Sequence, residues 1–170
     1  MNPKVEAAIE RLLEMEGAPL PEYRDAITRE LCGLTNSELS YFAVMNPEED
    51  VLTMIGWSRS AMGSCGIMDK PLIYKLEETG LWGDAVRERG PVITNNYQGS
   101  TKPTKKGYPA GHVHVENHMN LPIFDDGRIV LVVGIGNKPG GYTMDDAQLV
   151  EDLMSEAWKT FQRTLWTTVW

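Results

Sequence analysis

The amino-acid sequence predicts a single α+β domain, residues 1–170, whose helices lie on one face of an antiparallel sheet. Two amphipathic helical segments come first, two pairs of strand-like segments follow around short turns, and a long amphipathic segment closes the chain. A doubly wound sheet would need strands and helices in regular alternation. With 42% hydrophobic residues, the chain is long enough for one core that buries about 70% of the surface exposed by the unfolded chain.

The first two elements are predicted helices. In NPKVEAAIERLLEME, residues about 2–16, hydrophobic residues recur on one stripe, Asn2 is a suitable cap and Pro3 takes the first helical position. After the breaker GAPLP, the segment EYRDAITRELCGL is again helical and is expected to end near Gly33. Cys32 on this helix is predicted to be a small core residue.

A first antiparallel hairpin follows. The segments ELSYFAVMN and VLTMIGWSR have the composition of strands and flank PEED, which suits a turn. The next stretch, SRSAMGSCGIMDKP, has neither a helical nor a strand period and contains Cys65. It predicts a loop that covers a pocket.

A short helix, a strand and a long loop come next. LWGDAVRERG predicts a short helix ended by Gly90, and PVITNNY predicts a strand. The polar connection QGSTKPTKKGYPAGHVHVEN is longer than most loops in a compact domain, which is typical of a binding segment.

A second hairpin and a closing helix complete the chain. HMNLPIFDD and RIVLVVGIGNK flank the turn signal DDG, and IVLVVGIG is apolar enough for a central strand. Residues of about 143–166 predict one long amphipathic helix that opens with a capping-box pattern at Thr143 and Asp146.

Charge and composition exclude several classes of protein. The formal net charge is −8, and no stretch concentrates basic residues beyond Lys102, Lys105 and Lys106, so direct nucleic-acid binding is not expected. No apolar run approaches the ~18 residues of a membrane span, and the N-terminus has no secretory leader pattern. Cys32 and Cys65 form neither a disulfide framework nor a CxxC pair. We therefore expect a soluble, cytoplasmic protein with reduced thiols and no membrane partner.

Several segments of the sequence resemble those of a known family. The segments DKPLIYKLEETGLWGDAVRERGPVITNNY, KKGYPAGHV and HMNLPIFDDGRIVLVVGIGNK, with the long terminal helix, resemble a branch of the GAF domains of prokaryotic sensor kinases and related signalling proteins. The likeness runs from about Glu38 to Arg163. It implies a central antiparallel sheet of about six strands, with terminal helices on one face and a loop-covered small-molecule pocket on the other. Relatives bind cyclic nucleotides, haem, bilins or small metabolites, and the resemblance does not choose among them.

All three histidines lie in GHVHVENH, residues 111–118. On one extended strand, His112, His114 and His118 would share a face with Glu116 and could hold zinc or non-haem iron. The family pattern has counterparts of His112 and His118 but varies at His114. We therefore favour His112 or His118 facing a ligand, with His114 pointing away, over a metal site.

Cys65 admits three interpretations. With an imidazole from His112 or His118 it could hold haem or another tetrapyrrole, as in some related sensor domains. It could serve a redox enzyme similar to GAF-type methionine sulfoxide reductases, which use several pocket cysteines. It could also be a plain pocket-lining thiol, and the cofactor stays unknown at this point.

The predicted ligand site lies under two loops, 58–69 and 105–118, which should face each other across the sheet. Aromatic walls and directional amides complete it. The candidate ligand-binding residues are Cys65, Trp82, Asn95, Tyr108, His112, His118 and Asn120.

The sequence therefore predicts a sensory domain that reports ligand or redox state through its terminal helices and has no catalysis of its own. The alternatives are a redox enzyme that uses Cys65 and a purely structural dimerisation module. A small-molecule ligand and a kinase or regulator output domain are the expected partners. A parallel homodimer is also expected, because two helical stripes offer more apolar surface than one sheet face covers. These stripes are Val5, Ile9 and Leu12, and Val150, Met154, Phe161 and Leu165.

Overall fold

The computed structural model of the chain describes residues 1–58, 73–105 and 114–168, with side chains described as far as Thr160 and at Gln162. Within these residues, six strands form one sheet in the order β3-β2-β1-β6-β5-β4, with antiparallel pairing throughout. This confirms the predicted fold class. The strands are β1 Leu39–Met45, β2 Val51–Trp57, β3 Ile73–Lys75, β4 Val92–Thr94, β5 His118–Asp125 and β6 Arg128–Gly136.

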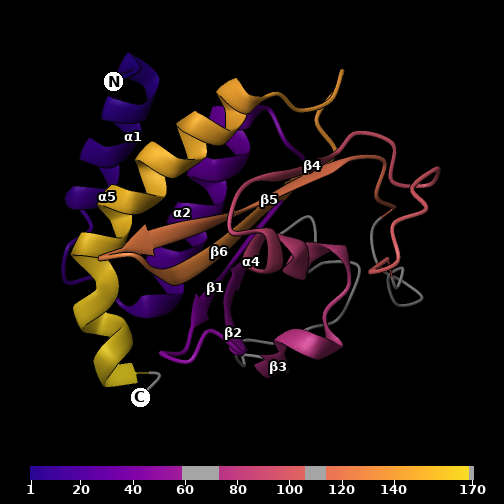
Figure 1. Cartoon of the computed structure of the whole chain (residues 1–170). Helices are drawn as coiled ribbons and strands as arrows, with labels where there is room; N and C mark the ends of the chain where they lie inside the picture. The colour runs from indigo at the N-terminus through magenta and orange to yellow at the C-terminus, as the bar shows by residue number, and fades with distance from the viewer. Residues whose placement is uncertain (59–72, 106–113, 169–170) are drawn as a thin grey trace.

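Three helices cover one face of the sheet: α1 Pro3–Leu13, α2 Leu20–Thr35 and α5 Met144–Thr168 (Figure 1). We call this side the helix face. The short helix α4 Asp84–Glu88 and the 3₁₀ turns η1 Leu76–Glu78 and η2 Leu81–Gly83 lie on the other side, with the connections between strands. We call that side the loop face. The arrangement is the one that the resemblance implied.

The main core lies between the helices and the sheet. It joins residues from all three helices to alternate residues of the central strands, and each large side chain buried there stabilises the fold by roughly 1.5–3 kcal/mol. Its fully buried members include Ile27, Leu31, Met119, Leu121, Leu153 and Met154. A smaller cluster on the loop face contains Ala43, Met45, Leu52, Met54 and Val132. Strand residues therefore alternate between two cores.

The apolar stripes predicted to form a dimer interface are largely used within one chain. Val5, Leu12, Val150 and Met154 are all buried in the core of the helix face. Ile9 is half-buried and packs against the same core. These five positions are covered within the chain, because α1 and α5 pack against each other and the sheet. The side chains of Phe161 and Leu165, the other members of the predicted stripes, lie outside the described residues.

Several predicted boundaries needed correction. Helix α1 ends at Leu13, and α2 continues through Gly33 to Thr35, because Asn36 takes the left-handed conformation and its N–H bonds to the Cys32 carbonyl. The missed strand β3 has only three residues, which is too short for a periodic pattern. The short helix was predicted correctly in type, but it ends at Glu88, before Gly90, with a left-handed Arg89.

Both hairpins were predicted correctly, and β6 is a central strand. Asp126 and Gly127 both have positive φ at the tip of the second hairpin, as a type I′ turn requires. At the start of α5, the Thr143 N–H donates to the Asp146 carboxylate over 3.0 Å, which confirms that side of the capping box. No described helix combines the length and apolarity that a membrane span needs.

Candidate ligand-binding site

Two rows of directly opposed residues cross the loop face and build the candidate site. Opposed residues on neighbouring strands share one face of a sheet, so the register places these side chains together. The first row runs through Trp57, Tyr41, Gly134 and Asn120. The second row runs through Leu39, Gly136, His118 and Thr94.

Glycines take the β6 position in both rows. A Cβ atom on Gly134 would lie 1.9 Å from a ring carbon of Tyr41 and 2.6 Å from Asn120 Oδ1. The side chains of Tyr41 and Asn120 therefore meet over the bare backbone of β6. Only glycine at position 134 lets side chains from β1 and β5 come this close to each other across β6.

A hydrogen-bonded chain results, running from Tyr41 through Asn120 to His118. The Tyr41 hydroxyl donates to Asn120 Oδ1, and Asn120 Nδ2 lies 2.8 Å from His118 Nδ1. Asn120 is only 2% exposed. Burial raises the pKa of Tyr41, so its hydroxyl keeps its proton.

His118 is a neutral imidazole at neutral pH. Burial, together with the positive charge of Lys102, lowers its pKa to about 4, against the opposing effect of the Asp84 carboxylate. The ring lies 5.5 Å from that of Tyr97, tilted by 59°. A neutral imidazole offers one hydrogen-bond donor and one acceptor.

A buried carboxylate fixes the segment that follows β4. Asp84, at the start of α4, accepts 2.7 Å hydrogen bonds from Arg87 and from the Thr104 hydroxyl. Lys102 lies 3.9 Å from the same carboxylate. Lys105 donates to the Tyr97 carbonyl over 2.7 Å, and its ammonium lies 4.6 Å from the Tyr97 ring centroid. These contacts hold Tyr97 beside His118.

Thr94 adds a polar atom directly opposite His118. The residue is 8% exposed, and its buried hydroxyl has no hydrogen-bond partner among the described residues. Buried hydroxyls in proteins are normally paired. Thr94 is therefore a polar group available for a contact at this end of the sheet.

Two further predicted residues have clear positions. Trp82 is half-buried on the loop face and lies edge-on to Tyr41 and Tyr74, with ring centroids 5.8 Å and 5.3 Å away. Asn95 instead holds the chain before α5: it accepts from the Tyr142 N–H over 2.8 Å and donates to the Tyr142 carbonyl over 3.1 Å. A ligand contact by Asn95 stays a prediction.

The remaining predicted residues give a partial picture. Cys65, Tyr108 and His112 lie outside the described residues. The side chain of His114 is exposed and precedes β5, which begins at His118, so the described end of GHVHVENH is not one straight strand. Within the described part of the chain, no three His, Cys, Asp or Glu residues come together as a metal site would require.

Sequence reasoning named His118 and Asn120 as candidates but did not name Tyr41, Gly134, Thr94 or Asp84. The available signal was the Gly-Ile-Gly pattern at the end of β6, because two glycines spaced by two residues leave one face of a strand bare. The strand register that brings Tyr41 over Gly134 could not be derived from one sequence.

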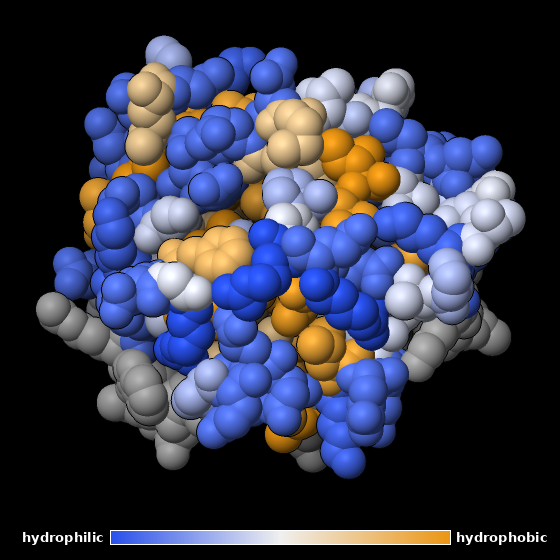
Figure 2. Space-filling view, in the orientation of Figure 1, coloured by the Kyte–Doolittle hydropathy of each residue, from blue (hydrophilic) through white to orange (hydrophobic). Residues whose placement is uncertain are grey.

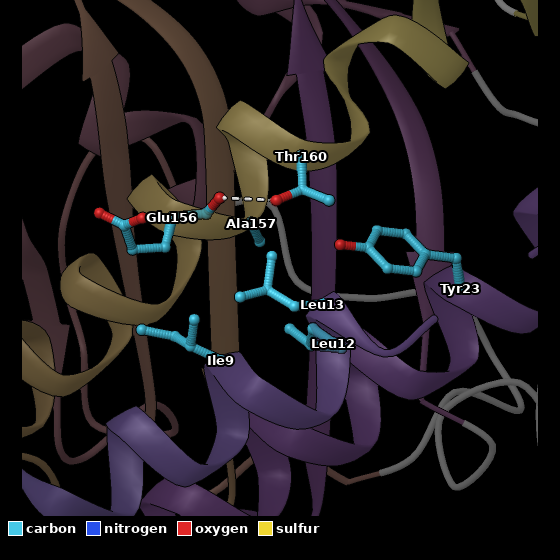
Figure 3. A pocket seen from close by; sticks show the side chains of 7 residues that line it. All are labelled: Ile9, Leu12, Leu13, Tyr23, Glu156, Ala157 and Thr160. Carbon is cyan, nitrogen blue, oxygen red and sulfur yellow. Dashed lines mark hydrogen bonds between the residues drawn. The ribbon is translucent and has the colours of Figure 1, made fainter. Parts of the chain in front are cut away.

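The pocket in Figure 3 lies elsewhere, on the helix side of the molecule. It contains about 170 Å³ of empty space continuous with solvent, between α1, α2 and α5. Its lining is mainly apolar: Ile9, Leu12, Leu13, Tyr23, Glu156, Ala157 and Thr160. The face of the molecule seen in Figure 2 is largely hydrophilic, with hydrophobic residues in small areas.

Comparisons with known proteins agree with this architecture. The sequence model of the GAF domain family matches residues 18–162. A curated relative, the methyl sulfide methyltransferase-associated sensor of Methanosarcina acetivorans, is 46% identical over 156 residues. The match covers 92% of this chain but only 16% of the relative, so the chain corresponds to a small part of that protein.

Solved structures share the fold at low sequence identity. The GAF domain of a phosphoenolpyruvate-protein phosphotransferase from Coxiella burnetii has a TM-score of 0.71 and 12% identity, with 95% of each chain covered. The free methionine-R-sulfoxide reductase from Neisseria meningitidis has a TM-score of 0.61 and 16% identity, with 95% of this chain and 92% of that one covered. At such identities the likeness shows the fold alone.

Proposed function

This chain belongs to the GAF domain family, and we propose that it is a sensory domain that binds a small molecule or cofactor at the loop face. The observation that carries the proposal is the hydrogen-bonded chain from Tyr41 through Asn120 to His118. Opposite His118 lies the buried Thr94 hydroxyl, which has no hydrogen-bond partner among the described residues. Convergent polar groups beside apolar walls are what small-ligand sites require.

Strand β5 supplies a physical connection from this site to the terminal helix. His118 and Asn120 point to the loop face, whereas Met119 and Leu121 pack in the core with α5. A ligand that moves β5 by a fraction of an ångström therefore shifts side chains that support α5, because packed cores transmit displacement. Asn95 adds a second connection, from the end of β4 to Tyr142 just before α5.

A longer signalling protein is the proposed setting. The curated relative is named as a sensor, which supports the sensory assignment, and this chain matches a small part of it. We propose that α5 passes the signal to a kinase or regulator output domain. A cytoplasmic location is proposed with it.

Haem or another tetrapyrrole remains the cofactor candidate, held by Cys65 with His112 or His118. Of these three residues the structure describes His118, which lies beside the aromatic ring of Tyr97.

The alternative of cysteine-based redox catalysis receives no support from the second thiol. Cys32 donates to the Ser40 hydroxyl over 3.3 Å, and burial raises the pKa of its thiol. A protonated, half-buried thiol is a poor partner for disulfide exchange, which requires a thiolate. Turnover of free methionine sulfoxide by the purified protein would contradict the sensory proposal.

Native mass spectrometry of freshly purified protein tests the proposal. We expect a retained mass that His118→Ala loses more readily than the unmodified chain, by about tenfold in affinity, because a buried hydrogen bond is removed. His114→Ala, at an exposed position, is the matched control and should leave retention unchanged. Equal loss from both variants would move the site away from β5. If no mass is retained and amide exchange in α5 is unaffected by added cofactors, the domain has a purely structural role.

A further inference from the structure

The polar chain on the loop face determines which nitrogen of His118 carries its proton. We propose that Tyr41 and Asn120 hold His118 as the Nε2–H tautomer, which makes it a hydrogen-bond donor to the ligand and prevents it from binding a metal ion. The ligand part of this proposal rests on the proposed function, whereas the tautomer does not.

The first step fixes the orientation of the Asn120 amide. The buried Tyr41 hydroxyl donates to Asn120 Oδ1. If the amide were turned over, its NH₂ group would face Tyr41, and the hydroxyl proton would lose this acceptor in a buried position. Leaving a buried donor unpaired costs about 1–3 kcal/mol, so the oxygen faces Tyr41 and Nδ2 faces His118.

The second step fixes the tautomer. An amide NH₂ group donates hydrogen bonds and does not accept them. His118 Nδ1, 2.8 Å away, must therefore accept with its lone pair. A neutral imidazole carries one proton, which therefore lies on Nε2. Binding a metal ion requires a lone pair, but Nδ1 uses its lone pair on Asn120 and Nε2 has none to give.

The electrostatic surroundings favour this neutral form. Burial and the charge of Lys102 both lower the pKa of His118, to about 4, against the opposing effect of Asp84. A doubly protonated ring would also place an N–H against the NH₂ group of Asn120. At neutral pH the ring is therefore a single, fixed donor.

The donor suggests which ligand chemistry fits. An Nε2–H group needs an acceptor atom, and the Thr94 hydroxyl directly opposite on β4 can donate to the same kind of atom. We therefore assign the part of the ligand that faces His118 as an oxygen acceptor. In a tetrapyrrole, an oxygen atom of the ligand would face His118, and another residue would hold any metal.

Histidine ¹⁵N NMR of the purified protein tests the tautomer directly, without any ligand. We expect His118 to show a protonated Nε2 and an unprotonated Nδ1 at neutral pH, with His114, whose side chain is exposed, as the internal reference. A protonated Nδ1 with a bare Nε2 would overturn the proposal.

Two conservative variants separate positioning from simple structural support. Asn120→Asp places a carboxylate acceptor beside Nδ1, so we expect the proton to move to Nδ1 and free Nε2. Tyr41→Phe removes the group that orients the amide, so we expect a mixture of both tautomers. An unchanged His118 spectrum in both variants would show that Tyr41 and Asn120 do not set the tautomer. Should either variant fail to fold, the spectrum of the unmodified chain still decides.

Added haemin tests the ligand part. We expect the iron absorption bands to keep their positions in His118→Ala and His118→Gln. We also expect haemin to dissociate about tenfold faster from the alanine variant, with partial rescue by glutamine, which retains a donor. Displaced bands in both variants would identify His118 as an iron ligand and overturn the proposal. If haemin does not bind at all, the cofactor candidate fails while the NMR result still decides the tautomer.

Discussion

Gly134 is the residue whose missing side chain allows the polar chain on the loop face to form. We expect Gly134→Ala to destabilise the protein by about 1–3 kcal/mol, because the new methyl group would overlap the Tyr41 ring and the Asn120 oxygen. Urea unfolding measures the change, and the His118 NMR signals should report loss of the fixed tautomer.

Gly33→Ala is the matched control for that substitution. Gly33 lies within α2, and nothing lies within 4 Å of the position its Cβ would take. Since alanine favours helix over glycine, this variant should be stabilised by up to about 1 kcal/mol. Equal destabilisation of both variants would show that the overlap with Tyr41 and Asn120 is not the cause of the lost stability.

His118 gives the protein a specific pH dependence. Its folded pKa, about 4, lies below the ordinary value of 6.5, so the fold favours the neutral ring. The resulting stabilisation is fully present above about pH 6.5 and is lost as the pH falls toward about 4, in total roughly 3 kcal/mol. The free energy of unfolding of His118→Gln should therefore fall less over this range than that of the unmodified protein. Parallel curves for the two proteins would contradict the shifted pKa.

At the scale of elements, Asn95 joins β4 to the start of α5. We expect Asn95→Ala to lower the free energy of unfolding by about 1–3 kcal/mol and to speed amide exchange in the first turn of α5. The reason is that the backbone N–H and carbonyl of Tyr142 both lose their side-chain partner. Asn96→Ala is the control, because the described hydrogen bond of the Asn96 side chain, accepted from the Gly99 N–H, is exposed. If both variants exchange alike, Asn95 does not connect the two elements.

The long elements could be predicted from the sequence because each carries its own periodic signal. Helices α1, α2 and α5 show amphipathic stripes, and the two hairpins have their turn residues between strand-like runs. The strand β3 and the end of α2 were not predictable in this way. Three residues carry no period, and the stop at Asn36 depends on one backbone conformation rather than on Gly33.

Half of the candidate site could be predicted for a similar reason. His118 and Asn120 stand two apart on a recognisable strand, so their shared face follows from the pleat. Tyr41 and Thr94 enter the site through pairing with strands distant in sequence. Register between distant strands is a tertiary property, and no local pattern in these segments specifies it.

At the scale of the whole molecule, we still predict a parallel homodimer through the terminal helices, but with a different contact surface. The exposed part of α1 offers Leu13, which is 49% exposed beside the pocket of Figure 3. We expect Leu13→Glu to weaken association about tenfold in sedimentation experiments, because apolar contact area is lost at the interface. Ile73→Glu, 72% exposed on β3, is the control and should leave association unchanged. If the unmodified chain stays monomeric at protein concentrations of about tens of micromolar, the predicted dimer is contradicted.

The two outermost strands of the sheet, β3 and β4, have three residues each. A long free edge exposes a row of unpaired backbone groups on which another chain can add a strand. Here each edge strand is short, while the long strand β6 is paired with β1 on one side and β5 on the other. The fold thus keeps the hydrophobic segment IVLVVGIG, which lies in β6, out of reach of neighbouring molecules, and this disfavours fibre formation.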